Sequence, residues 1–292
     1  MTAHVAQLID RGVVRATGAD VAKLLDGLIT NDIGALASRP AVHAALLSPQ
    51  GKILFAFFVV KSSDDFYLDV CRDYAAALVK RLNFYKLRAV AQFTDVSAEM
   101  TVAVSWGSPL SPVPGGVLAY PDPRHPTLGH RTILPPARLT ELGKSDADAD
   151  AYHAHRVACG VPEEERDYAL GDTFPHEADF DLQCGLSFTK GCFVGQEVVS
   201  RTQNKAVVRK RIVQILGESL RSGAEIKHGA GVVGSVGSVA GTSALAMLRL
   251  DRAAEAAAKG EPLTVDGRPI AVDAEALDRY RTSAASKPVI DL

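Results

Sequence analysis

The fold is decided by the stretch Phe188-Thr189-Lys190-Gly191-Cys192-Phe193-Val194-Gly195-Gln196-Glu197-Val198-Val199-Ser200-Arg201. Between Lys190 and Glu197 it holds a cation, a thiol, two glycines, an amide and a carboxylate, and apolar residues flank it. Glycine permits tight or left-handed backbone, and the apolar residues that follow recur at helical spacing. We therefore expect a loop that carries Cys192 and a helix that starts at Gly195 or Gln196.

Cys192 is the reactive candidate in this stretch. A position just before a helix N-terminus and close to Lys190 favours the thiolate and should lower the pKa of the thiol. Glu197, in the first turn of the helix, acts in the opposite direction because its charge occupies part of the helix dipole. Cys192 is therefore a candidate nucleophile, redox group or metal ligand. The alternative is a small turn residue that packs as an apolar group.

The run Lys190-Gly191-Cys192-Phe193-Val194-Gly195-Gln196-Glu197 resembles the signature of the YgfZ family, folate-binding relatives of the glycine cleavage T protein. That family usually has an aromatic residue, often tyrosine, at the position of Phe193. Its members act in the assembly or repair of iron–sulfur proteins and have been linked to tRNA modification. The resemblance implies the α+β T-protein (aminomethyltransferase folate-binding) fold, with mainly antiparallel sheet domains and a C-terminal β barrel.

Length, charge and cysteine content limit the classes of protein to which this chain can belong. The chain has 292 residues, enough for about two domains, and its net charge of −2 is not that of a general nucleic-acid-binding protein. Its longest apolar run, residues 53–60, is too short to span a bilayer, and residues 1–20 show no apolar secretion signal. These features predict a cytoplasmic protein without a membrane segment. Reduced thiols and no closed zinc site are expected, because no Cys-x-x-Cys pair occurs among Cys71, Cys159, Cys184 and Cys192.

The N-terminal half mixes strand and helix patterns. Asp20 is a candidate cap for a helix over residues 21–28. Strands at 41–47 and 53–60 are joined by the turn Ser48-Pro49-Gln50-Gly51. Further strands are predicted at 6–15, 66–70, 87–93 and 100–106, and a helix at 74–84. This order predicts an α+β domain with a mainly antiparallel sheet.

The same half resembles the T-protein fold at Leu28-Ile29-Thr30-Asn31-Asp32 and at the hairpin. By this resemblance, Asn31 is expected to bind folate. One departure concerns the strand after the hairpin turn, where the T protein carries an acidic pair and needs one aspartate for aminomethyl chemistry. The matching positions here are Phe55 and Ala56, and neither side chain can act as a general base or stabilise a cation.

The middle of the chain contributes the remaining folate candidates. Residues 108–150 are predicted to be an irregular junction, because proline and glycine are frequent up to residue 136. A helix is expected at 152–159, and the resemblance makes its Arg156 a folate-binding residue. The resemblance also matches Glu177 to the carboxylate that grips the pterin edge of folate, where one carboxylate accepts two adjacent N–H donors. Without the resemblance, Glu177 is interpreted as an exposed loop acid.

The pattern changes after Ala206. Glycines recur between residues 217 and 241 with short apolar stretches between them, which is typical of a small antiparallel barrel. We predict an α+β region at 1–204, a barrel domain at 205–292 and a loose tail after Tyr280. The basic run Lys205, Arg209, Lys210 and Arg211 is a candidate contact for the folate tail or for RNA phosphates, and the alternative is a solvated strand edge.

The favoured function is a tetrahydrofolate-binding accessory factor for the assembly or repair of iron–sulfur proteins. Its partners would be iron–sulfur client or assembly proteins. Cys192 would be the working thiol or a transient cluster ligand, Lys190 would hold it as thiolate, and Glu177 would bind folate. Gln196 and Glu197 would fix the turn and the helix start. If the protein is an enzyme, the alternative is a folate-dependent, aminomethyltransferase-like one-carbon transferase. A further alternative is an RNA-binding protein related to tRNA modification.

Overall fold

The structure is a computed structural model that describes residues 3–108, 117–143 and 147–286. The chain divides into two compact units, each of which is described separately. Unit 1 comprises Met1–Pro49, Ile53–Tyr152 and Leu182–Val194, and unit 2 comprises Gln50–Lys52, His153–Asp181 and Gly195–Leu292. The expected domain boundary between residues 204 and 205 stays a prediction.

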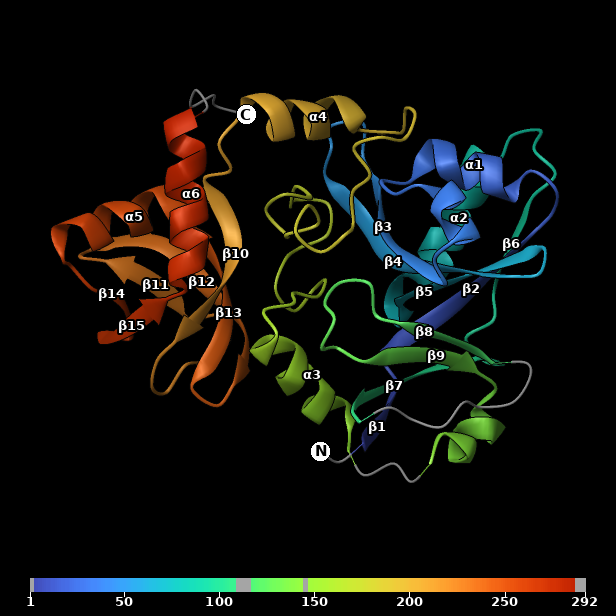
Figure 1. The fold of residues 1–292 in the computed structure, drawn as a ribbon, viewed down its shortest axis with the longest axis horizontal. Coiled ribbons are helices and arrows are strands. Elements are labelled where there is room, and N and C mark those ends of the chain that lie inside the picture. The colour runs from blue at the N-terminus through green and yellow to red at the C-terminus, as the bar shows by residue number, and fades with distance from the viewer. Residues whose placement is uncertain (1–2, 109–116, 144–146, 287–292) are drawn as a thin grey trace. The chain divides into compact units, whose positions relative to one another are not determined.

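Unit 1 contains a five-stranded antiparallel sheet with the strand order β3-β4-β5-β2-β6 (Figure 1). The predicted hairpin is confirmed, with Ala45 of β3 opposite Ala56 of β4. The strands are β2 (Arg11–Thr17), β3 (Ala41–Leu47), β4 (Ile53–Ser62), β5 (Asp65–Cys71) and β6 (Gln92–Asp95).

One face of this sheet packs against the helices α1 (Val21–Leu28) and α2 (Ala75–Tyr85), both close to the predicted ranges. Successive strand residues point to opposite faces. Phe57 of β4 therefore joins the helix-side core, whereas Phe58 joins a core on the other face. Burial on both faces explains why β4 is a continuous apolar run instead of an alternating one.

The second face packs against a four-stranded sheet with the order β1-β7-β9-β8 (Figure 1). Two expectations are corrected here. The single strand predicted at 6–15 is two strands in different sheets, because the chain turns at Ile9 and Asp10. The junction predicted to be irregular contains two strands and a 3-10 segment, although residues 109–116 and 144–146 lie outside the described residues. The elements are β1 (Ala3–Leu8), β7 (Thr101–Gly107), β8 (Leu118–Pro121), β9 (His130–Leu134) and η3 (Pro136–Leu142).

The strand predicted at 87–93 is also corrected. Residues 86–91 turn after α2, with the N–H of Ala89 bonded to the carbonyl of Lys86 at 2.7 Å, and β6 begins only at Gln92. Leu87 has a left-handed φ of 45°, which a strand does not allow. The remaining 3-10 turns of unit 1 are η1 (Ile33–Ala37) and η2 (Arg72–Tyr74).

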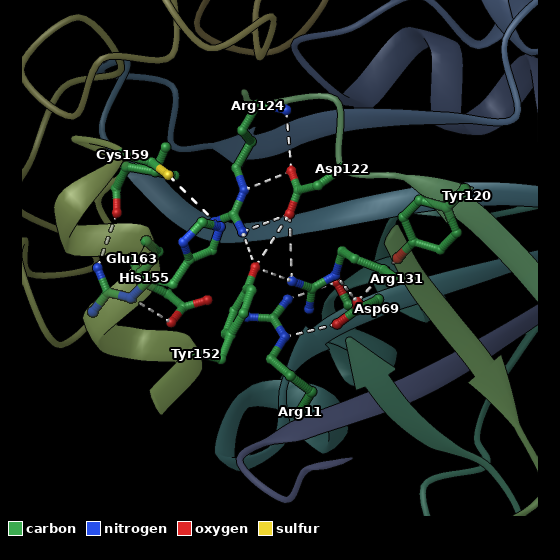
Figure 2. A network of polar contacts seen from close by, with 12 residues as sticks. Arg11, Asp69, Tyr120, Asp122, Arg124, Arg131, Tyr152, His155, Cys159 and Glu163 are labelled. Carbon is green, nitrogen blue, oxygen red and sulfur yellow. Dashed lines mark hydrogen bonds and ion pairs between the residues drawn. The ribbon is translucent and has the colours of Figure 1, made fainter. Parts of the chain in front are cut away.

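A buried carboxylate, Asp69 of β5, joins the two sheets of unit 1 (Figure 2). It accepts hydrogen bonds from Arg11 Nε of β2 at 2.7 Å and from Arg131 Nε of β9 at 2.8 Å. The hydroxyl of Tyr120 in β8 donates to it at 3.0 Å. Burial alone would raise the pKa of Asp69, but the charges of Arg11 and Arg131 outweigh this and hold it below its usual value.

A second buried pair extends this network. Arg124 donates from Nε and Nη2 to the carboxylate of Asp122 at 3.0 and 2.8 Å, and the pKa of Asp122 is lowered to about 2 because the guanidinium outweighs the effect of burial. The ring of Phe58 lies 4.9 Å from the guanidinium carbon of Arg124 and 4.5 Å from that of Arg131. Stacking on an aromatic face and pairing with carboxylates together satisfy charges that would otherwise be costly to bury.

We predict that Asp69→Asn destabilises the protein by about 3 to 5 kcal/mol, because it leaves buried arginine charge without its counterion. Denaturant unfolding of both variants would measure this loss. The matched control is Asp65→Asn in the same strand, whose pair with Arg15 is partly exposed and should cost less than about 1 kcal/mol. Equal losses in the two variants would contradict the assignment of Asp69 as the link between the sheets.

Unit 2 contains the C-terminal barrel, which is confirmed as six strands closed in the order β10-β13-β12-β11-β14-β15 (Figure 1). Its strands are β10 (Lys210–Leu216), β11 (Glu225–His228), β12 (Gly231–Ala240), β13 (Ser243–Arg249), β14 (Leu263–Val265) and β15 (Arg268–Val272). The helices are α4 (Gln196–Lys205), α5 (Leu250–Lys259) and α6 (Ala274–Ser286), and α3 (Ala149–Ala158) begins in unit 1. The tail expected to be loose after Tyr280 is therefore helical as far as Ser286.

Strand β10 is tied to the preceding loop through Arg211. Its guanidinium donates from Nη1 to Asp179 at 2.7 Å and to Asp181 at 2.8 Å. Asp179 has a left-handed φ of 60° and is buried. Burial raises the pKa of Asp179 to about 7 despite the attraction of Arg211, and the neighbouring charge of Asp181 adds to the increase.

This pair predicts a pH dependence of stability. The pKa of Asp179 is raised from 3.8 to about 7 in the folded state, so its contribution is fully present below 3.8 and is lost as the pH rises through about 7. Asp179→Asn should remove that loss, on the order of 4 kcal/mol, because the amide oxygen still accepts from Arg211 and asparagine tolerates left-handed φ. Denaturant unfolding of wild type and variant between about pH 4 and 8 measures the difference. Parallel stability curves would show that Asp179 does not titrate, and Asp181→Asn serves as the neighbouring control.

Candidate functional site

The loop Leu182–Val194 of unit 1 carries Cys192 and is fixed to the segment after α1. The hydroxyl of Thr30 donates to the carbonyl of Gly185 at 2.7 Å and accepts the N–H of Ala45 at 2.8 Å. The N–H of Ser187 donates to the carbonyl of Thr30 at 2.9 Å. Ala45 belongs to β3, the edge strand of the five-stranded sheet, so these bonds attach the first half of the loop to that edge.

Asn31 also fixes the same loop by hydrogen bonds. Its amide nitrogen donates to the carbonyls of His43 and Cys184, both at 2.7 Å, and its oxygen accepts the N–H of Asp32 at 2.9 Å. Both amide N–H groups and the amide oxygen therefore have partners within unit 1. The predicted folate contact of Asn31 stays a prediction, and a ligand at this side chain would have to compete with these bonds.

Lys190 anchors the second half of the loop at the C-terminus of α1. Its ammonium group donates to the carbonyls of Asp26, Ile29 and Asn31 at 2.5, 2.9 and 2.8 Å, and it lies 3.3 Å from the carboxylate of Asp26. The last carbonyls of a helix lack intrahelical partners and carry partial negative charge, which a cation stabilises. The last turn of α1 contains no basic residue of its own. Lys190 is distant in the sequence and supplies the positive charge and the hydrogen-bond donors that this helix end lacks.

The same contacts limit what Lys190 can do for Cys192. An ammonium group has three N–H donors, and three carbonyls occupy them. Burial lowers the pKa of Lys190, against the opposing effect of Asp26. The expectation that Lys190 holds the Cys192 thiolate stays a prediction, and a direct hydrogen bond between them would require one carbonyl to be released.

Cys192 is exposed, and the buried side chains of Lys190 and Phe193 precede and follow it in the sequence. The side chain of Lys190 is 1% exposed and Phe193 is 7% exposed, and the ammonium nitrogen lies 5.4 Å from the centre of the phenylalanine ring. Gly191 is exposed together with Cys192. The loop is thus pinned on both sides of the thiol, so that the thiol is presented to solvent without the freedom of an unanchored loop.

The predicted helix start after this loop is confirmed. Gly195 is the N-cap of α4 with a left-handed φ of 82°, a conformation that glycine adopts without strain, and Gln196 is the first helical residue. The side chain of Glu197 is 89% exposed and lies 3.6 Å from Arg201 one turn later. Glu197 therefore contributes a first-turn charge to the helix.

The hairpin turn quoted from the sequence packs on this helix within unit 2. A Cβ placed on Gly51, whose φ is 82°, would lie 2.8 Å from Cβ of Val198 in α4, so only glycine fits there. The ammonium of the neighbouring Lys52 lies 3.5 Å above the ring of Phe174 and donates to the carbonyl of Asp172. Two motifs that are far apart in the sequence are thereby in contact.

Glu177 and Arg156 are also in unit 2. Glu177 is half-buried, and its Oε2 accepts the N–H of Phe174 at 2.9 Å, which closes the turn that contains it. Arg156 is buried and donates to Asp167 at 2.6 Å and to Ser238 of β12 at 2.6 Å. The geometry therefore gives Arg156 a role in joining α3 to the barrel. The folate contacts of both residues stay predictions.

The residues of the basic run make different contacts. Arg211 is engaged by Asp179 and Asp181, and Lys205 is the last residue of α4, where its charge complements the helix dipole. RNA binding through this run stays a prediction, and Arg211 is already paired with Asp179 and Asp181.

Sequence reasoning missed the residues that hold the loop. Thr30 belongs to a segment that the resemblance singled out, yet its buried hydroxyl was given no role. The carbonyls of Asp26 and Ile29 carry no signal in a sequence, because backbone acceptors have no residue type. Cys184 is exposed like Cys192, and nothing in its spacing distinguished it.

The barrel matches a known domain family. Residues 209–277 match the family described as CAF17, C-terminal beta-barrel domain. This range runs from just before β10 into α6, so it covers the whole closed barrel.

Curated relatives extend the similarity to most of the chain. The sequence is 34% identical over 231 residues to the protein named iron-sulfur cluster assembly factor IBA57 homolog, mitochondrial, of Mycosarcoma maydis, covering 73% of this chain and 57% of that protein. Proteins of the same name in Neurospora crassa and Pyricularia oryzae are 30% and 31% identical, each over 73% of this chain and over 53% and 57% of theirs. The chain thus spans little more than half the length of these relatives.

One expectation is tested by these relatives, and a second by the helices of the structure. The predicted cytoplasmic location is wrong, because the relatives are named as mitochondrial proteins. An apolar signal reports on secretion, and its absence carries no information about import into an organelle. For membranes, no helix within the described parts of the chain is long and apolar enough to cross a bilayer.

A solved structure confirms the predicted fold class. The glycine cleavage system aminomethyltransferase T from Bartonella henselae matches with a TM-score of 0.69 over 85% of this chain and 79% of that one, at 15% identity. The chain is therefore similar to iron–sulfur cluster assembly factors named IBA57 and has an aminomethyltransferase-like α+β fold with a CAF17-type C-terminal barrel.

Proposed function

We propose that this protein is an accessory factor in the assembly or repair of iron–sulfur proteins, with Cys192 as its working thiol. The observation that carries the proposal is the exposed thiol between two anchored neighbours, Lys190 and Phe193. Ordering a loop costs conformational entropy. A chain that fixes the residues on both sides of a cysteine and leaves the thiol exposed has a thiol suited to reaction with another molecule.

The thiol would act as a ligand for iron in a cluster that passes between proteins. Cysteine binds metal as the thiolate, so ligation releases a proton from Sγ. Iron–sulfur clusters generally take four thiolates, whereas unit 1 exposes two cysteines, Cys184 and Cys192. A cluster held at Cys192 would therefore need ligands from a partner, which fits an accessory factor better than a protein that stores its own cluster.

A folate-dependent one-carbon transferase is the second candidate, and the aminomethyltransferase-like fold favours it. The positions matched to the acidic pair of that enzyme argue against it. Phe55 and Ala56 of β4 are both buried, and the ring of Phe55 packs edge-on against Tyr74 at 6.3 Å. Without a carboxylate at either position, the reaction centre lacks its general base or cation-stabilising group.

Folate binding itself belongs to the proposal and rests on Glu177. The carboxylate is half-buried, and one of its oxygens closes a local turn through Phe174. Asn31 and Arg156 have partners within their own units that fit a role in building the fold. Tetrahydrofolate would therefore be recognised mainly at its pterin edge, by a carboxylate that accepts two adjacent N–H groups.

Glu177→Gln should weaken tetrahydrofolate binding by at least about tenfold, because the amide replaces one acceptor oxygen with a donor. Titration calorimetry of the purified protein measures this directly. Glu197→Gln is the matched control, since the side chain of Glu197 is 89% exposed in the first turn of α4. Absence of binding by wild type would remove folate from the proposal and leave the thiol function to stand on the next experiment.

Cys192→Ser should fail to restore the activity of iron–sulfur enzymes in cells that lack this protein. Cys184→Ser, a change at the other exposed thiol of the same loop, should restore it. The readout is the activity of an iron–sulfur enzyme relative to one without a cluster, with protein levels compared by immunoblot. Full rescue by Cys192→Ser would falsify the role of the thiol. Turnover of a methylated amine with consumption of tetrahydrofolate would instead support the transferase.

A further inference from the structure

Unit 1 exposes a group of large apolar side chains at the end of α2. Phe84, Leu87 and Val90 are 73%, 86% and 64% exposed. We call these three residues the α2 tip. Single exposed apolar residues are ordinary, but several within seven positions of the sequence are typical of a surface that another molecule covers.

An open depression adjoins the α2 tip. It has a volume of about 440 Å³ and is lined by Asp20, Lys23, Leu24, Gly27, Leu28 and Ala89. The tip and the depression are joined by hydrogen bonds. The N–H of Val90 donates to the carboxylate of Asp20 at 2.7 Å, and the N–H of Asp20 donates to the carbonyl of Val90 at 3.1 Å. The turn after α2 is thereby fixed against α1, and the protruding and hollow parts form one surface.

This surface is positively charged, although the chain as a whole has a net charge of −2. Residues 74–94 contain four basic residues and no acidic residue. The lining of the depression carries one charge of each sign, Lys23 and Asp20, so the positive excess comes from the four basic residues of this segment. The basic residues are Lys80, Arg81, Lys86 and Arg88. A local excess of one charge selects a partner of the opposite charge and accelerates its association.

The surface is close to the Cys192 loop through α1. The helix has eight residues, which corresponds to a length of about 12 Å. Lys23 and Leu24 line the depression from this helix, and the carbonyls of Asp26 and Ile29 at its end hold Lys190. A molecule bound in the depression would therefore lie within reach of the loop that presents the thiol.

We propose that the α2 tip and the depression form the docking surface for a partner protein, which presents an amphipathic segment with acidic and large apolar side chains. This inference rests on the proposed function, because it identifies the surface by which the cluster-bearing partner is held beside Cys192. Apolar side chains of the segment fill the depression and cover the tip, and its carboxylates face the basic residues.

Two other kinds of partner fit less well. A membrane surface would accept the protruding tip and the basic residues but would leave the hollow beside them unfilled. RNA would match the charge and could stack a base on the exposed ring of Phe84, but it would leave aliphatic Leu87 and Val90 and the hollow beside them without a matching contact. A protein segment would cover the apolar tip, fill the hollow and pair with the basic residues.

The test measures binding of a fluorescein-labelled amphipathic helical peptide built from leucine and glutamate, by fluorescence anisotropy with the full-length protein. A peptide with lysine in place of glutamate is the charge control. Wild type should bind the acidic peptide and not the basic one. The double variant Phe84→Ser with Leu87→Ser should weaken binding by at least about tenfold, and Arg81→Glu with Arg88→Glu should do the same.

Val232→Ser is the matched control, because Val232 is 56% exposed on the barrel and its substitution should leave binding unchanged. Circular dichroism verifies that the tip variants fold, which their exposed positions favour. Equal binding of both peptides, or acidic-peptide binding that survives the tip substitutions, would overturn the proposal. Tip-dependent binding to anionic phosphatidylserine vesicles or to tRNA, without binding to the acidic peptide, would overturn it in favour of those partners.

The docking surface and the thiol can be tested separately. Cys192→Ser should bind the acidic peptide as wild type does, since the thiol is outside the depression. The tip variants should fail to restore iron–sulfur enzyme activity in cells even though Cys192 still reacts with iodoacetamide. Rescue by Cys192→Ser together with failure of the tip variants would remove the thiol function and keep the docking surface.

Discussion

The buried carboxylate of Asp69 is the interaction on which unit 1 depends. It lies between the two sheets, and the arginines that bind it come from both, Arg11 from β2 and Arg131 from β9. A buried ion pair adds little net stability compared with apolar packing, but it is costly to break and tolerates few alternative arrangements. The network therefore fixes how one sheet lies on the other, and apolar packing around Phe58 supplies the stabilisation. The five-stranded sheet becomes a rigid base for the helices on its opposite face.

The position of the exposed thiol depends on the five-stranded sheet through α1, which packs on it. The link is the set of carbonyls at the end of α1. Helix ends leave carbonyls without partners, and a chain must satisfy those that are buried. Here the solution comes from Lys190, so the requirement of the helix and the anchoring of the loop are met by one ammonium group. Thr30 and Asn31 fix the other half of the loop to β3 and α1. The position of Cys192 is therefore determined by the packing of α1, and not only by its own short loop.

The sequence predicted those elements whose pattern is local. The hairpin at 41–60 was predicted because its apolar residues and turn are contiguous, and the start of α4 was predicted because Gly195 precedes a helical pattern. Strands β8 and β9 were missed because they are short and lie in a segment rich in proline and glycine. Arg11 and Arg131 were not singled out because an isolated arginine resembles a surface residue until its partner is known. The contacts of Lys190 were inaccessible for a related reason, since its acceptors are backbone atoms about 160 positions away.

The similarity to an aminomethyltransferase, at 15% identity, is a similarity of fold. A fold sets the arrangement of elements, whereas function depends on the groups placed on it. In this chain Phe55 and Ala56 occupy buried positions in β4, where aminomethyl chemistry would require an acid. The reactive group that remains prominent is a thiol on the exterior of the same unit. A transferase encloses its reaction to exclude water, but a ligand for a cluster passed between proteins must be reached by another protein. Under the proposed function, the anchored thiol would exchange a cluster at the surface of the fold, whereas a transferase would need an acid inside it.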